Sequence, residues 1–193
     1  MSVICDRGIQ KLVDNGLIDF NLSETDYNTV VKQINSNTMD LTLGKYIRWP
    51  VSNMEPITLG GSYEADKYWD LQTVIPEKGV MLMPGDIFLG CSREFFCMPS
   101  DICGQVFTKS SVGRLFINHM MAGVIDAGFH GTITLELKNE GKHNIIIPYG
   151  ARVVQIQLSR LEEKPERDYS ARSSRYNGQI RPEPAREEKK NFC

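Results

Sequence analysis

Short apolar runs separated by Gly, Pro and Asn follow one another along most of this chain. Runs of this length suit β-strands better than helices, which need longer periodic stretches. Their regular spacing, at intervals of roughly ten residues, is typical of an antiparallel β-barrel or β-sandwich. We therefore expect a mainly β fold with strands near residues 41–43, 80–83, 87–89, 102–107, 132–137, 144–147 and 153–158.

One helix and two tight turns are also predicted. The apolar residues of segment 6–15 lie on one side of a helical wheel, and an Asn-Gly pair ends the segment. Segments 84–85 and 148–150 begin with Pro and end with Gly. Proline presets φ and glycine tolerates positive φ, so both segments are expected to be turns.

The chain is long enough for one core. It has 193 residues, 41% of them hydrophobic, which is too few for two ordinary domains with separate cores. The apolar pattern stops near Arg160, and the charged run at 186–190 has too little apolar content to pack. We expect one β domain over residues 1–160 and a disordered tail over 183–193.

Composition argues against several classes of protein. The five cysteines are an odd number and form no C-x-x-C pair, which favours a reducing cytoplasm over a secreted disulfide framework. No apolar run is long enough for a signal peptide core or a membrane span. A net charge of −2 offers no basic face for a nucleic acid. A soluble, cytoplasmic protein is expected, with neither membrane nor nucleic acid as partner.

The strand expected at 132–137 carries one carboxylate. Alternation places Ile133 and Leu135 on one face and Thr134 and Glu136 on the other, polar face. A glutamate on such a face is most often a solvated surface residue, so its role depends on what lies near it.

Segment 109–114, with the sequence Lys-Ser-Ser-Val-Gly-Arg, combines hydroxyls, cations and a glycine. Such a turn or helix start can bind phosphate oxygens through free backbone N–H groups, hydroxyls and positive charge. The same pattern also caps ordinary helices. Asp126, before Ala-Gly, likewise reads first as the former of an Asx-turn.

Taken together and in order, five segments resemble those of the dCTP deaminase and dUTPase superfamily of trimeric, mainly β nucleotide enzymes. The resemblance covers nearly the whole chain, and its segments are 37–44, 83–99, 110–114, 122–131 and 175–179. It implies a dUTPase-type fold, a distorted and jelly-roll-like β-barrel with a few short helices. It also implies a lid over residues 161–182 that covers the nucleotide.

The resemblance assigns the chemistry to three residues. Deaminases carry a glutamate at the position of Glu136, and a carboxylate can take a proton from water and return it to the leaving ammonia. Ser110 and Arg114 would orient that water and stabilise the charge that develops near C4 of cytosine. The implied reaction converts dCTP, or a 5-substituted dCTP, to the dUTP product and ammonia.

The remaining site residues also follow from the resemblance. Asp126 would contact the 3′-hydroxyl of a deoxyribose, and lid residues would close over the phosphates. The implied substrate contacts are Lys109, Ser111, Ala122, Asp126, Thr134, Leu135, Gln155, Tyr169, Arg175 and Gln179.

No zinc site is predicted. Zinc-dependent cytosine deaminases need H-x-E and P-C-x-x-C signatures, and the chain has neither. His119, His130 and His143 lack a Cys or His at ligand spacing and are expected to be polar surface residues. Mg²⁺ is expected only through the phosphates of the substrate, with no ligand from a protein side chain.

Some positions depart from the family pattern. Lys109 stands where deaminases usually have Arg, which turns a bidentate phosphate contact into a single point charge. Met121 stands where Thr or Asn is common, and with Met120 it is expected to reshape the pocket around the 5-position of the pyrimidine. Base preference and feedback by dTTP depend on this region.

Three functions stay open. Gly123 and Val124 resemble the pattern of bifunctional relatives, which continue to dUMP and pyrophosphate, so dual activity is the nearest alternative. The second alternative is a non-catalytic regulator that binds dCTP, dTTP or dUTP. In each case the resemblance implies a homotrimer, because in this superfamily the phosphate motif of one subunit faces the nucleoside loop of another.

Overall fold

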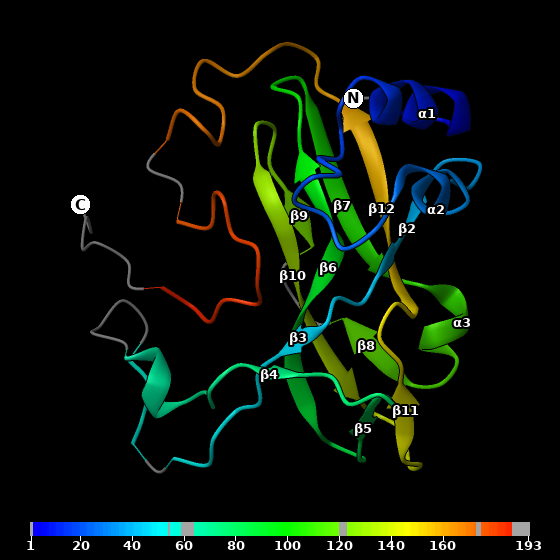
Figure 1. The fold of residues 1–193 in the computed structure, drawn as a ribbon. Coiled ribbons are helices and arrows are strands. Elements are labelled where there is room, and N and C mark those ends of the chain that lie inside the picture. Colours follow the sequence, from blue (N-terminus) through cyan, green and yellow to red (C-terminus); the bar gives the residue numbers. More distant parts are fainter. Residues whose placement is uncertain (1, 54, 59–63, 120–122, 173–174, 187–193) are drawn as a thin grey trace.

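The computed structural model describes residues 2–53, 55–58, 64–119, 123–172 and 175–186, and most of its regular structure is β-strand (Figure 1). The strands are β1 (Ser2–Val3), β2 (Met39–Thr42), β3 (Tyr46–Ile47), β4 (Thr73–Val74), β5 (Val80–Leu82), β6 (Ile87–Cys97), β7 (Ile102–Thr108), β8 (Ile117–His119), β9 (Val124–Ile125), β10 (His130–Asn139), β11 (Ile145–Ile147) and β12 (Arg152–Arg160). The helical elements are short: α1 (Asp6–Asp14), α2 (Tyr27–Val31), the 3-10 turn η1 (Ala65–Lys67) and α3 (Ser110–Gly113). The expected mainly β fold with few short helices is confirmed.

Two larger sheets form the body of the molecule. One has the strand order β1-β12-β7-β9, with β2 also paired to β12. The other has the order β6-β10-β8, and the pairs β11-β5 and β3-β4 complete the set. Bridges from Leu43 to Ser92 and from Arg48 to Leu89 join the chain after β2 to β6. The two larger sheets are therefore connected, as in a distorted barrel.

A single hydrophobic core fills the space between these sheets. It holds Phe88 and Leu135 from one sheet and Leu41 and Ile156 from the other, all fully buried. The helix α1 adds Ile9 from its apolar side. Leu135, expected at the nucleotide, thus has its side chain in the core, so any contact from this residue to a ligand would have to come from its backbone.

All seven expected strands are present, and α1 lies where the helix was predicted. The expected turns are confirmed by positive φ values of 86° at Gly85 and 75° at Gly150. Several elements were not foreseen, namely α2, β1, β3, β4, β8 and β9. Each of these strands has only two or three residues, which is too few to show an alternating pattern.

The chain after β12 returns to β10 as an irregular segment, drawn in orange and red in Figure 1. Gly178 N–H donates to His130 O at 2.8 Å, and Thr132 N–H donates to Gln179 O at 2.9 Å. Pro184 is buried, so the packed part of this segment passes residue 183, where the tail was expected to begin. The extents of the lid and of the tail stay predictions.

Gly131 lies at the seam between β10 and this segment. Its φ is 146°, a conformation that L side chains rarely adopt. A Cβ placed on it would lie 3.0 Å from Gln179 O and 3.1 Å from the ring of Phe129. Only a residue without a side chain lets the two backbones approach this closely.

None of the helices in the described ranges is both long and apolar enough to cross a membrane.

The burial of Leu135 gives a prediction on stability. Leu135→Ala should lower the free energy of unfolding by about 2–5 kcal/mol, because it removes apolar contacts and leaves a cavity in the core. Urea unfolding followed by circular dichroism measures this. The exposed Leu71 provides the control, since Leu71→Ala should change the free energy by less than about 0.5 kcal/mol. Equal, small effects of both substitutions would contradict the placement of Leu135 in the core.

Candidate active site

A cavity of about 490 Å³ opens beside β10 and is bordered by β6, the loop after β9 and the C-terminal segment. This volume is within the range of small-molecule sites. Five of the residues expected at the site line it: Asp126, Thr134, Glu136, Tyr169 and Gln179. Residues far apart in the sequence thus converge on one hollow, among them the proposed proton shuttle Glu136, the sugar contact Asp126 and two lid residues.

A β-bulge sets the local geometry of β10. Thr132 is paired with Phe95 but Thr134 with Cys91, so β6 carries two extra residues at this point. Ile133 N–H, displaced from the regular ladder, donates instead to Ser92 Oγ at 2.9 Å. The expected alternation is modified as a result. Ile133 is buried in the core and also borders the cavity, while Thr132, expected on the polar face, is buried.

Glu136 lies in the cavity and is partly buried, with a side chain that is 24% exposed. A titratable neighbour is His119, whose Nδ1 lies 3.6 Å from Glu136 Oε2. Neither of these two buried atoms has a hydrogen-bond partner within the described part of the chain. Buried polar atoms are nearly always satisfied, so this pair marks a place for a water molecule or a ligand group.

The expectation that His119 is a surface residue is wrong. It belongs to β8, pairs with Leu137 of β10, and has a side chain only 2% exposed. Burial lowers the pKa of His119, although the neighbouring Glu136 carboxylate acts in the opposite direction. The sequence contains one signal of this placement: His119 stands two residues after the buried Ile117, on the same side of a short strand.

The C-terminal segment covers one side of the cavity. Gln179 Nε2 donates to Thr132 O at 2.6 Å, and its Oε1 is buried without a partner among the described residues. The ring of Tyr169 packs against Phe129 at a centroid distance of 5.7 Å, and burial raises the pKa of Tyr169. Arg175, also expected in the lid, does not border the cavity, and its carbonyl accepts a hydrogen bond from Arg186.

The cavity has further aromatic and acidic lining that the sequence did not reveal. Trp69 borders it from the irregular chain between η1 and β4, and Glu183 borders it from the C-terminal segment. Trp69 is placed by a bridge to Pro50, within a stretch that shows no apolar periodicity. Pattern-based reasoning has no signal for such a residue.

The expected phosphate-binding segment lies elsewhere. Ser110 and Ser111 begin α3, and together with Arg114 they are exposed and do not border the cavity. Within a single chain, therefore, Glu136 is not brought together with Ser110 and Arg114. Ala122, Met120 and Met121 lie outside the described residues.

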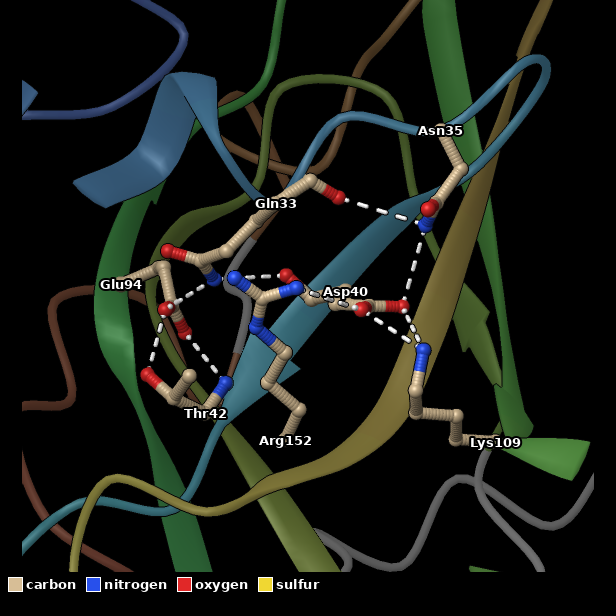
Figure 2. Close-up of polar contacts among 7 residues, drawn as sticks. All are labelled: Gln33, Asn35, Asp40, Thr42, Glu94, Lys109 and Arg152. Carbon is tan, nitrogen blue, oxygen red and sulfur yellow. Dashed lines mark hydrogen bonds and ion pairs between the residues drawn. The ribbon is translucent and has the colours of Figure 1, made fainter. Parts of the chain in front are cut away.

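Lys109 belongs to a polar cluster around the buried carboxylates of Asp40 and Glu94 (Figure 2). Lys109 Nζ donates to both carboxylate oxygens of Asp40, at 2.9 and 2.7 Å. Gln155, on β12, is paired directly with Asp40 on β2 and does not border the cavity. Lys109 is thus engaged by a carboxylate of its own chain.

A second carboxylate of this cluster, Glu94, is held differently (Figure 2). It accepts hydrogen bonds from Thr42 Oγ1 at 2.6 Å, from Thr42 N–H at 3.1 Å and from Gln33 Nε2 at 2.8 Å. Among the described residues no cation pairs with this completely buried carboxylate, and its burial raises the pKa of Glu94.

Across the ranges that the structure describes, no three His, Cys, Asp or Glu side chains converge in a way that could hold a metal ion.

Comparisons with known proteins point to one family. A family model described as dCTP deaminase-like matches residues 3–161. A dCTP deaminase, dUMP-forming, from Methanothermobacter thermautotrophicus is 33% identical over 192 residues, which is 96% of this chain and 94% of that protein. A dCTP deaminase from Natronomonas pharaonis is 33% identical over 187 residues, which is 95% of this chain and 94% of that one.

A solved structure shares the fold. The 2′-deoxycytidine 5′-triphosphate deaminase from Agrobacterium tumefaciens superimposes with a TM-score of 0.62 at 22% identity, covering 81% of this chain. The match spans 47% of that longer chain, so the present chain corresponds to about half of its length.

The burial of His119 predicts how stability depends on pH. With a pKa below 6.5 in the folded protein, His119 binds its proton more readily in the unfolded chain, so stability should fall as the pH drops below about 6.5. Urea midpoints measured between about pH 7.5 and pH 5 test this. His119→Asn should flatten the profile, whereas the exposed His143→Asn should leave it unchanged. Identical profiles for wild type and His119→Asn would contradict the assignment.

Proposed function

The chain belongs to the dCTP deaminase-like family, and we propose on that basis that it hydrolyses the C4–amine bond of dCTP to give dUTP and ammonia. The observation that carries this proposal is the position of Glu136. Its carboxylate lies in a cavity of nucleoside size, partly shielded from solvent, with one oxygen left without a partner in the described chain. A surface glutamate on a solvated strand would have none of these properties.

The carboxylate of Glu136 performs the proton transfers. It takes a proton from a water molecule as the water oxygen adds to C4 and passes that proton to N3. It then moves the proton of the new C4 hydroxyl to the amine, which leaves as ammonia while C4 becomes a carbonyl. One water is consumed and one ammonia is released. His119, uncharged because burial lowers its pKa, lies beside Glu136 without neutralising it by an ion pair.

Ser110, Ser111 and Arg114 complete the site from a second copy of the chain. Their exposure on α3, outside the cavity of their own chain, supports this arrangement. Ser110 and Arg114 orient the water and stabilise the developing charge, and Ser111 binds phosphate. In a closed homotrimer, cyclic symmetry lets α3 of each subunit contribute these residues to the cavity of the next subunit.

The substrate is held by contacts from both sides of the cavity. Asp126 binds the 3′-hydroxyl, Thr134 and the backbone of Leu135 contact the base, and Tyr169 and Gln179 cover the nucleotide. The remaining proposed contacts to the nucleotide are Ala122, Gln155 and Arg175, of which Gln155 and Arg175 do not border the cavity of their own chain. Mg²⁺ enters with the triphosphate, bound through phosphate oxygens and water.

The cellular setting follows from the reaction. Deamination of dCTP is a step of pyrimidine deoxynucleotide metabolism, and we place it in the cytoplasm. The free thiols of Cys5, Cys91, Cys97 and Cys103 suit a reducing compartment.

Glu136→Gln tests the proposed mechanism. The amide cannot take a proton from water, so ammonia release from dCTP should fall by about 10²–10⁴-fold. Binding of dCTP, measured by calorimetry, should remain, because Gln has nearly the shape of Glu. Glu140→Gln is the control, since Glu140 follows the end of β10 and is exposed, and this variant should keep full activity. A Glu136→Gln variant as active as the wild type would rule out the shuttle.

A second function has specific support. Several relatives carry the name dCTP deaminase, dUMP-forming, among them those from Methanothermobacter thermautotrophicus and Methanosphaera stadtmanae at 33% and 34% identity. In this version the same protein also hydrolyses the α–β phosphate linkage and releases pyrophosphate with dUMP.

Product analysis separates these functions. Incubation with dCTP should yield ammonia, and mass spectrometry identifies what accompanies it. Ammonia with dUTP alone indicates deamination only, whereas equal yields of ammonia, pyrophosphate and dUMP indicate the bifunctional enzyme. Tight binding of dCTP, dTTP or dUTP without any ammonia would instead indicate a non-catalytic regulator. Parallel rates with a 5-substituted dCTP define the preference at the 5-position.

A further inference from the structure

Asp40 is almost completely enclosed, and three side chains converge on it (Figure 2). Its carboxylate is 1% exposed and accepts hydrogen bonds from Lys109 at 2.7 and 2.9 Å, from Asn35 at 3.1 Å and from Arg152 at 3.4 Å. A buried carboxylate is stable only when cations or donors satisfy it, and here all its partners are present.

Lys109 connects this carboxylate to α3. It is the residue that caps the N-terminus of α3, and its carbonyl accepts hydrogen bonds from Val112 N–H and Gly113 N–H, both at 2.9 Å. Fixing the Lys109 side chain therefore fixes α3, which begins at Ser110 and is followed directly by Arg114.

The strands that carry Asp40 and precede Lys109 both pair with β12. Asp40 lies on β2 opposite Gln155, and Lys109 follows β7 directly after Thr108, which lies opposite Val154. Both pairings are to β12, so the hydrogen-bond ladders of a single strand determine how far Asp40 lies from α3.

We propose that Asp40 is a positioning residue for the phosphate-binding turn, that Lys109 is the tether through which it acts, and that Lys109 is not itself a phosphate ligand. This inference rests on the proposed function, since it concerns where Ser110 and Arg114 are held for the reaction. It assigns roles to Asp40 and Arg152 that sequence reasoning did not give them.

The geometry disfavours a direct phosphate contact from Lys109. Both oxygens of Asp40 bind its ammonium group, and the Lys109 side chain is 28% exposed. Moving this ammonium to a phosphate would leave the enclosed carboxylate with Asn35 and the longer contact to Arg152. Separating one partner from a buried ion pair is strongly unfavourable. Arg152, 44% exposed, supplies the second positive charge that keeps the pair stable.

Asp40→Asn distinguishes the two roles by the sign of its effect. If Lys109 is a tether, the variant loosens α3, displaces Ser110 and Arg114, and lowers kcat/KM for dCTP by about a hundredfold. If Lys109 is a phosphate ligand, the variant frees its ammonium, and KM for dCTP falls. The matched control is Asp101→Asn, which removes another carboxylate paired with an arginine of β12, that of Arg160, far from α3. This control should keep the activity of the wild type.

A measurement without turnover separates the tether from the proposed function. In Asp40→Asn and in Lys109→Met, the amides of Val112 and Gly113 should exchange hydrogen at least about tenfold faster than in the wild type, while those of β12 stay protected. Lys109→Arg should restore protection, because a guanidinium matches both oxygens of a carboxylate.

The outcomes are distinct. A wild-type protein that releases no ammonia from dCTP ends the proposed function, and the exchange experiment still decides on the tether. Unchanged exchange at Val112 and Gly113 in Lys109→Met overturns the tether, as does a lower KM in Asp40→Asn. Should Asp40→Asn fail to fold, Lys109→Met carries the test, because Asp40 keeps its contacts to Asn35 and Arg152 in that variant and circular dichroism checks that it is folded.

Discussion

The pairing of β10 with β6 on one side and β8 on the other is the constraint on which the rest of the site depends. It places Leu135 and Leu137 in the core, and by alternation it leaves Glu136 facing the cavity. The same pairing brings His119 against that carboxylate. A slip of one residue would exchange core and cavity side chains, so burial of the leucines holds the acid in place.

Two carboxylates of the polar cluster show how a protein interior treats charge in different ways. Asp40 is paired with the cations Lys109 and Arg152, whereas Glu94 receives hydrogen bonds from neutral groups and has its pKa raised by burial. The first arrangement links strands to α3 through full charges. The second stabilises the bulged part of β6 through hydrogen bonds, at the point where the ladder with β10 is interrupted.

The strand positions and the polar face on which Glu136 lies could be predicted because apolar spacing and alternation are local properties of the sequence. What escaped prediction depends on which strands become neighbours. His119 was expected at the surface, but the pairing of β8 with β10 buries it. Lys109 was expected to contact a phosphate, but the pairing of β2 with β12 brings Asp40 to it. Trp69 reaches the cavity through an irregular segment that carries no periodic signal. The roles of the remaining site residues stay predictions.

The contact at Gly131 between β10 and the C-terminal segment controls how the cavity is covered, but not where Glu136 lies. A side chain there would collide with Gln179 and Phe129 and push the C-terminal segment away from β10, yet position 131 lies several residues from the acid on the same strand. How closely the C-terminal segment covers the cavity and where Glu136 lies within it therefore depend on different residues of β10. Adding a single methyl group at residue 131 would therefore change how easily molecules enter and leave the cavity.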